Sequence, residues 1–181
     1  MRRRIASQES PCQWIRNLQG ESCRGRARSV DDGFVFVADD QDLPEGDLIL
    51  TLSRFQTEGE VLLSQGRRVG VKLLADQEVE ALAYDLPRLS VVALDFPKFG
   101  DGRSYSNARL LRERYGFKGQ VRAVGDVLRE QAGFLLRVGF DAFEPADGSS
   151  ANEWQAAALR YRHVFQRAAD ARAPVYLERE A

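Results

Sequence analysis

Residues 94–144 read LDFPKFGDGRSYSNARLLRERYGFKGQVRAVGDVLREQAGFLLRVGFDAFE, and their pattern is the strongest indication of the fold. Short apolar runs lie in or beside this stretch at 90–94, 120–124 and 140–143, each bounded by turn residues, as is typical of buried parallel strands. Between the first two runs, Tyr105, Ala108, Leu111 and Tyr115 recur with the period of a helix. The stretch therefore predicts strands that alternate with helices, which implies parallel pairing through right-handed crossovers.

The same alternation continues on both sides of this stretch. Further apolar runs lie at 48–52 and 69–73, a short strand is expected at 34–38, and helical periods occur near 79–86, 128–138 and 154–168. Five strand–helix units thus fall between about residues 47 and 170. The sequence predicts an α/β fold with a five-unit, mostly parallel sheet flanked by helices, in a flavodoxin-like open arrangement. The alternative is a partial TIM-barrel-like sheet, since the 181 residues fall short of the roughly 200 that a full barrel needs.

Composition sets the domain organisation and the class of protein. The chain is 44% hydrophobic and 29% charged, which is typical of a globular domain, and no apolar run is long enough for a membrane span. We expect a basic, flexible N-terminal arm over residues 1–29, one α/β domain over 30–170 and a C-terminal tail over 171–181. Cytoplasmic localisation without a membrane partner follows as an expectation, because the N-terminus lacks the apolar stretch of a secretory signal.

Charge and metal-ligand residues narrow the function classes. Residues 1–28 carry seven arginines against two glutamates, a net charge of +5. Arginine replaces lysine almost throughout the chain, so we attribute this excess to coding bias and expect no nucleic-acid partner. Cys12, Cys23 and His163 are the only cysteines and histidine, and their spacing suits no metal site. Redox chemistry would need an organic cofactor, whose identity the sequence leaves open, or a protein partner.

The loop that follows the strand expected at 90–94, the third of the five units, is the most unusual connection. It carries Lys98 and Arg103, and Gly102 precedes the helix that starts near Ser104. A helix N-terminus beside two cations is suited to binding an anion, and Arg54 could reach the same edge of the sheet, because ligands bind beyond the carboxyl ends of parallel strands. We therefore predict an anion-binding site for a small oxyanion at these five residues. The alternative is that the two cations pair with nearby carboxylates and fix the loop.

Carboxylates surround this predicted site. Asp126 follows the next strand, and with Lys98 it forms the predicted catalytic acid–base pair. The alternative role of Asp126 is to cap the helix that follows. Further rim carboxylates are Asp95, Asp101 and Glu144. Lys72 lies within a strand, where it either extends its charge into water or serves as a Schiff-base nucleophile of a barrel-like lyase.

Four motifs carry a resemblance to a known family: VGVKL (69–73), DLPRL (85–89), DFPKFGDGRSYSNARLLRERYGFKGQVRAVGDVL (95–128) and GFDAFE (139–144). With them, residues 31–165 resemble the bacterial domain of unknown function 934 family, whose members are often described as oxidoreductases linked to sulfite reduction. The resemblance implies a role in sulfur assimilation and a sulfite or nitrite reductase hemoprotein as partner. Relatives are expected to show RCGF where this chain has Arg137, Val138, Gly139 and Phe140, so a catalytic thiol is absent at that position.

Two functions of different classes remain. The first is an oxidoreductase or redox-linked enzyme that acts on a small sulfur oxyanion or an anionic cofactor held at the predicted site. The alternative is a non-catalytic accessory subunit that docks on the reductase. The resemblance carries over no established catalytic residues, so the site residues rest on the chemical arguments above.

Overall fold

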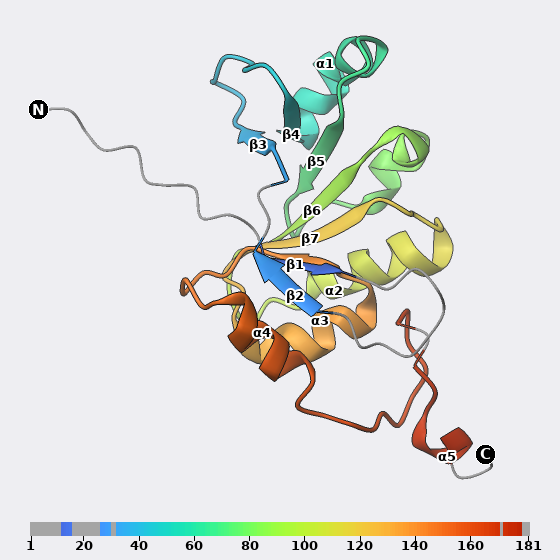
Figure 1. Ribbon diagram of the computed structural model, residues 1–181. Helices are drawn as coiled ribbons and strands as arrows, with labels where there is room; N and C mark the ends of the chain where they lie inside the picture. Colours follow the sequence, from blue (N-terminus) through green and yellow to red (C-terminus); the bar gives the residue numbers. More distant parts are fainter. Residues whose placement is uncertain (1–11, 16–25, 30–31, 171, 179–181) are drawn as a thin grey trace, which may run out of the picture.

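The computed structural model describes residues 12–15, 26–29, 32–170 and 172–178. The strands form one eight-stranded sheet with the order β2-β1-β8-β7-β6-β5-β4-β3 (Figure 1). The strands are β1 (Cys12–Ile15), β2 (Arg26–Ser29), β3 (Phe34–Val37), β4 (Asp47–Thr51), β5 (Val69–Leu73), β6 (Val91–Phe96), β7 (Gln120–Gly125) and β8 (Ala142–Phe143). Strands β3 to β8 are parallel to their neighbours, whereas β1 pairs antiparallel with β8 and with β2.

The predicted α/β class with a mostly parallel sheet is confirmed. The five predicted strands correspond to β4 to β8, and the short strand expected at 34–38 joins them as β3, which gives six parallel strands. These six lie side by side in chain order. A doubly wound sheet of flavodoxin type interrupts that order, whereas a barrel follows it, so the strand order is that of the partial-barrel alternative.

The helices differ in regularity because of their local sequences. Thr51 starts the first helix by accepting a hydrogen bond from the Arg54 N–H, and Ser150 and Glu153 form a capping box at the start of α4. Pro87 breaks the helical period expected near 79–86 into two 3₁₀ turns. The helical elements are α1 (Leu52–Ser64), η1 (Val79–Leu82), η2 (Leu86–Arg88), α2 (Arg103–Arg109), the π-helical η3 (Leu110–Arg114), η4 (Arg129–Gln131), α3 (Ala132–Val138), α4 (Ala151–Ala158) and α5 (Val175–Glu178).

The predicted helix over 154–168 is wrong beyond its first part. Helix α4 ends at Ala158, so the apolar stripe expected to continue along it is not formed. Tyr161 and Phe165 are instead 70% and 78% exposed. An extended segment leads from α4 to α5, which lies away from the sheet (Figure 1).

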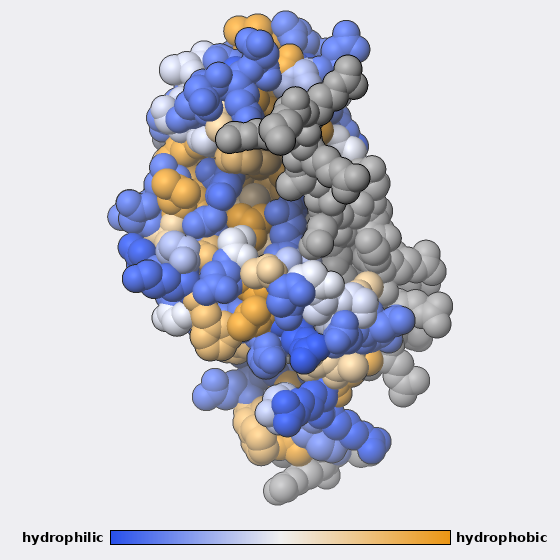
Figure 2. Space-filling model, turned by 90° about the vertical axis from the view of Figure 1, so that its left-hand side faces the viewer, coloured by the Kyte–Doolittle hydropathy of each residue, from blue (hydrophilic) through white to orange (hydrophobic). Residues whose placement is uncertain are grey.

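The two faces of the sheet have different partners. The larger core cluster joins one face to residues of the helices, and it includes Trp154, which stacks on Phe143 with the ring centroids 4.7 Å apart. The smaller cluster, on the opposite face, contains strand residues only: Ile49, Val91, Ala93 and Val124, with Phe34 against them. We call this second surface the helix-free face. Figure 2 shows one side of the molecule, on which apolar residues form separate patches among hydrophilic ones.

Strand register places polar residues in one row on the helix-free face. Thr51 is paired with Lys72, Lys72 with Ala93, Ala93 with Arg122 and Arg122 with Ala142. Side chains of paired residues point to the same side of a sheet. The row therefore carries two cations, one on each side of the small Ala93.

An ion pair shows how strongly this sheet is curled. Arg122 on β7 pairs with Asp32, which precedes β3, although β7 and β3 are four strands apart in the sheet. Flat strands at that separation would lie roughly 19 Å from each other. The sheet is therefore curled so that the helix-free face is concave, and the ion pair spans this face.

The N-terminal region also contributes to the sheet. Strands β1 and β2 lie within residues 1–29, where we expect a basic arm, and β1 pairs with the edge strand β8. Part of this region is therefore joined to the domain. Among the described residues, no helix combines the length and the apolar character that a membrane span requires.

Candidate functional site

The loop of the predicted anion site, residues 97–102, is fixed by backbone contacts at the carboxyl end of β6. The Asp126 carboxylate accepts a hydrogen bond from the Phe99 N–H (2.8 Å), and the Gln131 amide donates to the Phe99 carbonyl (3.4 Å). The Asp101 N–H donates to the Lys98 carbonyl (2.9 Å). Asp126 therefore holds the loop that follows the neighbouring strand.

The Gln131 side chain links this loop to the start of α2. Its amide donates a second hydrogen bond to the Tyr105 hydroxyl (2.8 Å), and burial raises the pKa of Tyr105 against the opposing effect of that bond. The Tyr105 ring contacts the rings of Phe96 and Phe134, at centroid distances of 5.1 and 4.8 Å. The aromatic residues thus pack the loop against α3.

The charges at the start of α2 are paired within the loop. The Arg103 guanidinium donates to both oxygens of Asp101, at 3.0 and 2.7 Å. The hydrogen bond from Arg103 is the largest cause that lowers the pKa of Asp101 to about 2, and the charge of Lys98 contributes to the same shift. The buried Ser104 hydroxyl donates to the Asp95 carbonyl (2.6 Å), and Gly102 precedes the first residue of α2. Lys98 is exposed and forms no ion pair with any residue that the structure describes.

Arg54 is held by other contacts, at the start of α1. Its guanidinium donates to the carbonyls of Ala38 (2.6 Å) and Gln41 (2.7 Å), and it pairs with Glu58 on the same helix (3.3 Å). The Arg54 side chain is only 9% exposed. Its contacts therefore fix the turn between β3 and β4, and none of them involves the loop of Lys98.

The predicted rim carboxylates belong to three separate pairs. Asp101 pairs with Arg103, as described above, whereas Asp95 pairs with Lys72 (2.8 Å) on the helix-free face. Glu144 pairs with Arg122 (3.1 Å) on that same face. The structure thus gathers Lys98, Gly102, Arg103, Ser104, Asp101 and Asp126 at one loop, and it assigns Asp95 and Glu144 to the helix-free face.

The residue that the sequence arguments missed is Arg122. Its side chain is 2% exposed, and it bonds to Asp32, Glu144 and Gln120, the last at 2.6 Å. A charged residue inside the apolar run at 120–124 was the available signal. Its partners could not be inferred, because Asp32 is 90 residues distant along the chain.

Lys72 lies in the same row of the helix-free face as Arg122, and its side chain also has partners within the chain. Besides its ion pair with Asp95, its ammonium group lies 5.2 Å from the ring centroid of Phe36, and its side chain is 25% exposed. A Schiff-base lysine must present its amine to the substrate, whereas this group is occupied by the Asp95 carboxylate and the Phe36 ring. These contacts favour a structural role for Lys72.

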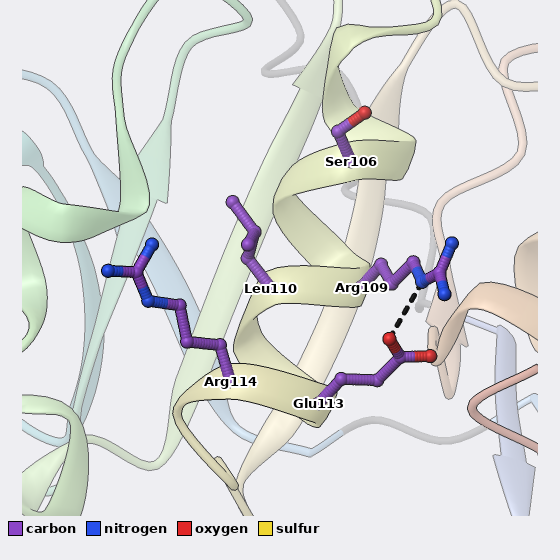
Figure 3. Close-up of a pocket in the computed structure, with 5 residues that line it drawn as sticks. All are labelled: Ser106, Arg109, Leu110, Glu113 and Arg114. Atoms are coloured by element: carbon purple, nitrogen blue, oxygen red, sulfur yellow. Dashed lines mark hydrogen bonds and ion pairs between the residues drawn. The ribbon is translucent and has the colours of Figure 1, made fainter.

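Two cavities lie away from the loop. The first, of about 390 Å³, lies on the outer side of α2 and η3, where Ser106, Leu110, Arg114 and the Arg109–Glu113 ion pair (2.8 Å) line it (Figure 3). The second, of about 490 Å³, lies between α3, α4 and the segment after α4. Among the described residues, no group of three potential ligands could hold a metal ion.

The fold and the site define a class: an α/β protein with a curled parallel sheet whose strand-end charges are largely paired with one another. The model of a protein family described as "Bacterial protein of unknown function (DUF934)" matches residues 70–176, more than half of the 181 residues. The chain therefore belongs to this family, which confirms the resemblance drawn from the motifs. Comparison with curated proteins gives no match, and comparison with solved structures gives none.

Proposed function

We propose that this protein serves assimilatory sulfite reduction as a non-catalytic accessory subunit that docks on a sulfite or nitrite reductase hemoprotein. The pathway and the partner are what the family resemblance implies. The accessory role is favoured because most of the charged residues at the strand ends pair with other residues of the same chain.

One observation carries this choice: apart from Lys98, the polar side chains of the predicted site are engaged in hydrogen bonds within the protein. Arg103 is occupied by Asp101, the Ser104 hydroxyl by the Asp95 carbonyl, and Asp126 by the Phe99 N–H. An anionic ligand would compete with the Asp101 carboxylate for the charge of Arg103, and each hydrogen bond to a charged group contributes about 1.5 to 3 kcal/mol. The loop backbone is itself fixed, because Asp126 and Gln131 bond to Phe99 and the Asp101 N–H donates to the Lys98 carbonyl.

Copurification tests the accessory role. The tagged full-length protein is isolated from sulfate-grown cells, and its absorbance spectrum is recorded with that of any bound partner. We expect the reductase hemoprotein to copurify and the separated protein to show no pigment of its own. A bound flavin on the separated protein, with no reductase present, would contradict the proposal.

Growth of a deletion strain tests the pathway separately. We expect impaired growth on sulfate and on sulfite and normal growth on cysteine, because only the first two require sulfite reduction. Normal growth on all three would remove the link to this pathway, provided that the strain has no second copy of the gene.

The second candidate is an oxidoreductase with Lys98 and Asp126 as its acid–base pair, and one observation favours it. Lys98 is exposed on a fixed loop and forms no ion pair with the described residues. Calorimetric titration with sulfite, sulfate, phosphate and flavin mononucleotide tests it, with Lys98→Met and Arg103→Gln as variants. Binding that weakens in both variants while melting is unchanged would favour the enzyme over the accessory subunit.

A further inference from the structure

The second cavity is lined mainly by basic and aromatic side chains. One wall is formed by η4 and α3 and the other by the end of α4 and the segment that follows it. Four arginines and one glutamate line it, so its lining carries a net charge of +3. We call it the arginine groove, and its main polar and aromatic residues are Arg129, Arg137, Arg160, Arg172, Phe134 and Tyr161.

Three of these arginines have no carboxylate within ion-pair distance among the residues that the structure describes. Within the described part of the chain, Arg137, Arg160 and Arg172 form no ion pair, whereas Arg129 pairs with Glu153 (2.7 Å). A protein surface usually places carboxylates beside such a cluster, because like charges repel. The cluster is therefore complementary to an anion from outside the chain.

Two of the three guanidinium groups are held in position by backbone carbonyls. Arg137 donates to the Gln166 carbonyl, and Arg172 donates to the carbonyls of Tyr161 (3.3 Å) and Arg162 (2.7 Å). A guanidinium carries five N–H donors, so each group retains donors for a ligand. Binding to groups that are already ordered costs less conformational entropy.

Aromatic rings complete the groove. Phe134 and Tyr161 line it and are 55% and 70% exposed, and the Arg160 guanidinium lies 5.9 Å from the Tyr161 ring centroid. Exposed aromatic rings gain free energy when a flat ring of a ligand covers them, and the planar guanidinium group of arginine can donate two parallel hydrogen bonds to two oxygens of a phosphate. The groove therefore has partners for both a ring and a phosphate.

We propose that the arginine groove binds a phosphate ester that carries an aromatic ring system, of the size of a mononucleotide. The phosphate contacts Arg137, Arg160 and Arg172, and the ring lies against Tyr161 or Phe134. The volume of about 490 Å³ falls in the range of about 300 to 1,000 Å³ that is usual for small-molecule sites. This site is independent of the proposed accessory role and of the loop of Lys98.

Calorimetry with matched ligands tests the proposal on the full-length protein. Adenosine monophosphate and flavin mononucleotide are the probes, adenosine lacks the phosphate, and ribose 5-phosphate lacks the ring. We expect at least one probe to bind, and adenosine and ribose 5-phosphate to bind tenfold or more weakly than adenosine monophosphate. Equal affinity for adenosine monophosphate and ribose 5-phosphate would overturn the assignment of a ring site.

Variants locate the binding. Arg137→Gln and Arg160→Gln each should weaken nucleotide binding roughly ten- to a hundredfold, since each removes a charge-assisted contact. Arg160 has no hydrogen bond from its guanidinium to the described residues, so its replacement preserves folding even where that of Arg137 does not. Tyr161→Ala should weaken nucleotide binding but leave that of ribose 5-phosphate unchanged. The control is Arg109→Gln, an exposed arginine on α2 that lines the other cavity.

Two results would overturn the proposal. One is the absence of binding by either probe at millimolar concentration. The other is binding that is equal in the wild type, Arg137→Gln and Arg160→Gln. If a polyglutamate peptide binds the groove and neither nucleotide does, the groove is a docking surface for an acidic protein, and the nucleotide proposal fails.

Discussion

The buried ion pair between Arg122 and Asp32 should be the most costly polar contact to break. The perturbation is Arg122→Met, which keeps most of the side-chain volume and removes the charge. Arg122 and Asp32 are 2% and 11% exposed, so the substitution leaves a carboxylate with little access to water. Glu144, the other acidic partner, is 43% exposed and can be hydrated when the arginine is lost.

The magnitude follows from this difference in burial. Removing one partner of a buried ion pair destabilises a protein by about 3 to 5 kcal/mol, because the remaining charge stays uncompensated. For a chain of this length, each kcal/mol lowers the melting temperature by about 2 to 4 °C. We therefore expect Arg122→Met to melt roughly 6 to 20 °C below the wild type.

Urea and thermal melts followed by circular dichroism provide the assay, with Asp32→Asn and the double variant completing a cycle. The double variant should be more stable than Arg122→Met alone, because it also removes the carboxylate charge that Arg122 compensates in the wild type. A loss below about 1 kcal/mol in Arg122→Met, which is the range of an exposed pair, would show that burial does not strengthen this contact. So would a double variant as unstable as the sum of the two single ones.

Three further predictions concern the strand ends and the core. Arg103→Gln should raise the pKa of Asp101 from about 2 toward its ordinary 3.8. A carboxyl group whose pKa is lowered in the folded state stabilises the fold at pH values above its ordinary pKa, and this stabilisation is lost as the pH falls toward 2. An unchanged titration of Asp101 in NMR spectra of the variant would contradict the pairing. Gly125→Ala should cost about 1 to 3 kcal/mol in urea melts, because φ is +91° and an added Cβ would lie 2.5 Å from the Phe96 carbonyl oxygen. Trp154→Ala, at a fully buried ring, should cost about 3 to 5 kcal/mol, and a melt unchanged from wild type would show that α4 is dispensable.

The sequence predicted the strands well and their spatial order less well. Apolar runs bounded by turn residues located β4 to β8, because a strand covered on both faces needs apolar residues in succession. The order of neighbouring strands is not encoded in that pattern. It depends on which face each crossover helix covers, and here the helices contribute to one core cluster only.

The candidate site shows the same limit. The loop that carries Lys98 and Arg103 was located from its length and glycines, and the alternative that its cations pair with nearby carboxylates describes Arg103 correctly. The partners of Arg122 and the arginine groove could not be predicted, since both join segments distant in the chain. Tyr161 illustrates the reason: its helical period suggested a core position, but α4 ends before it.

Sulfite-dependent turnover distinguishes an accessory subunit from an enzyme. The purified protein, the purified reductase hemoprotein and their mixture are each assayed with a common electron donor, and complex formation is followed by analytical ultracentrifugation. An accessory subunit should form a complex, show no turnover alone, and change the turnover or the lifetime of the reductase in the mixture. Turnover by the protein alone, abolished in Lys98→Met, would contradict the accessory role.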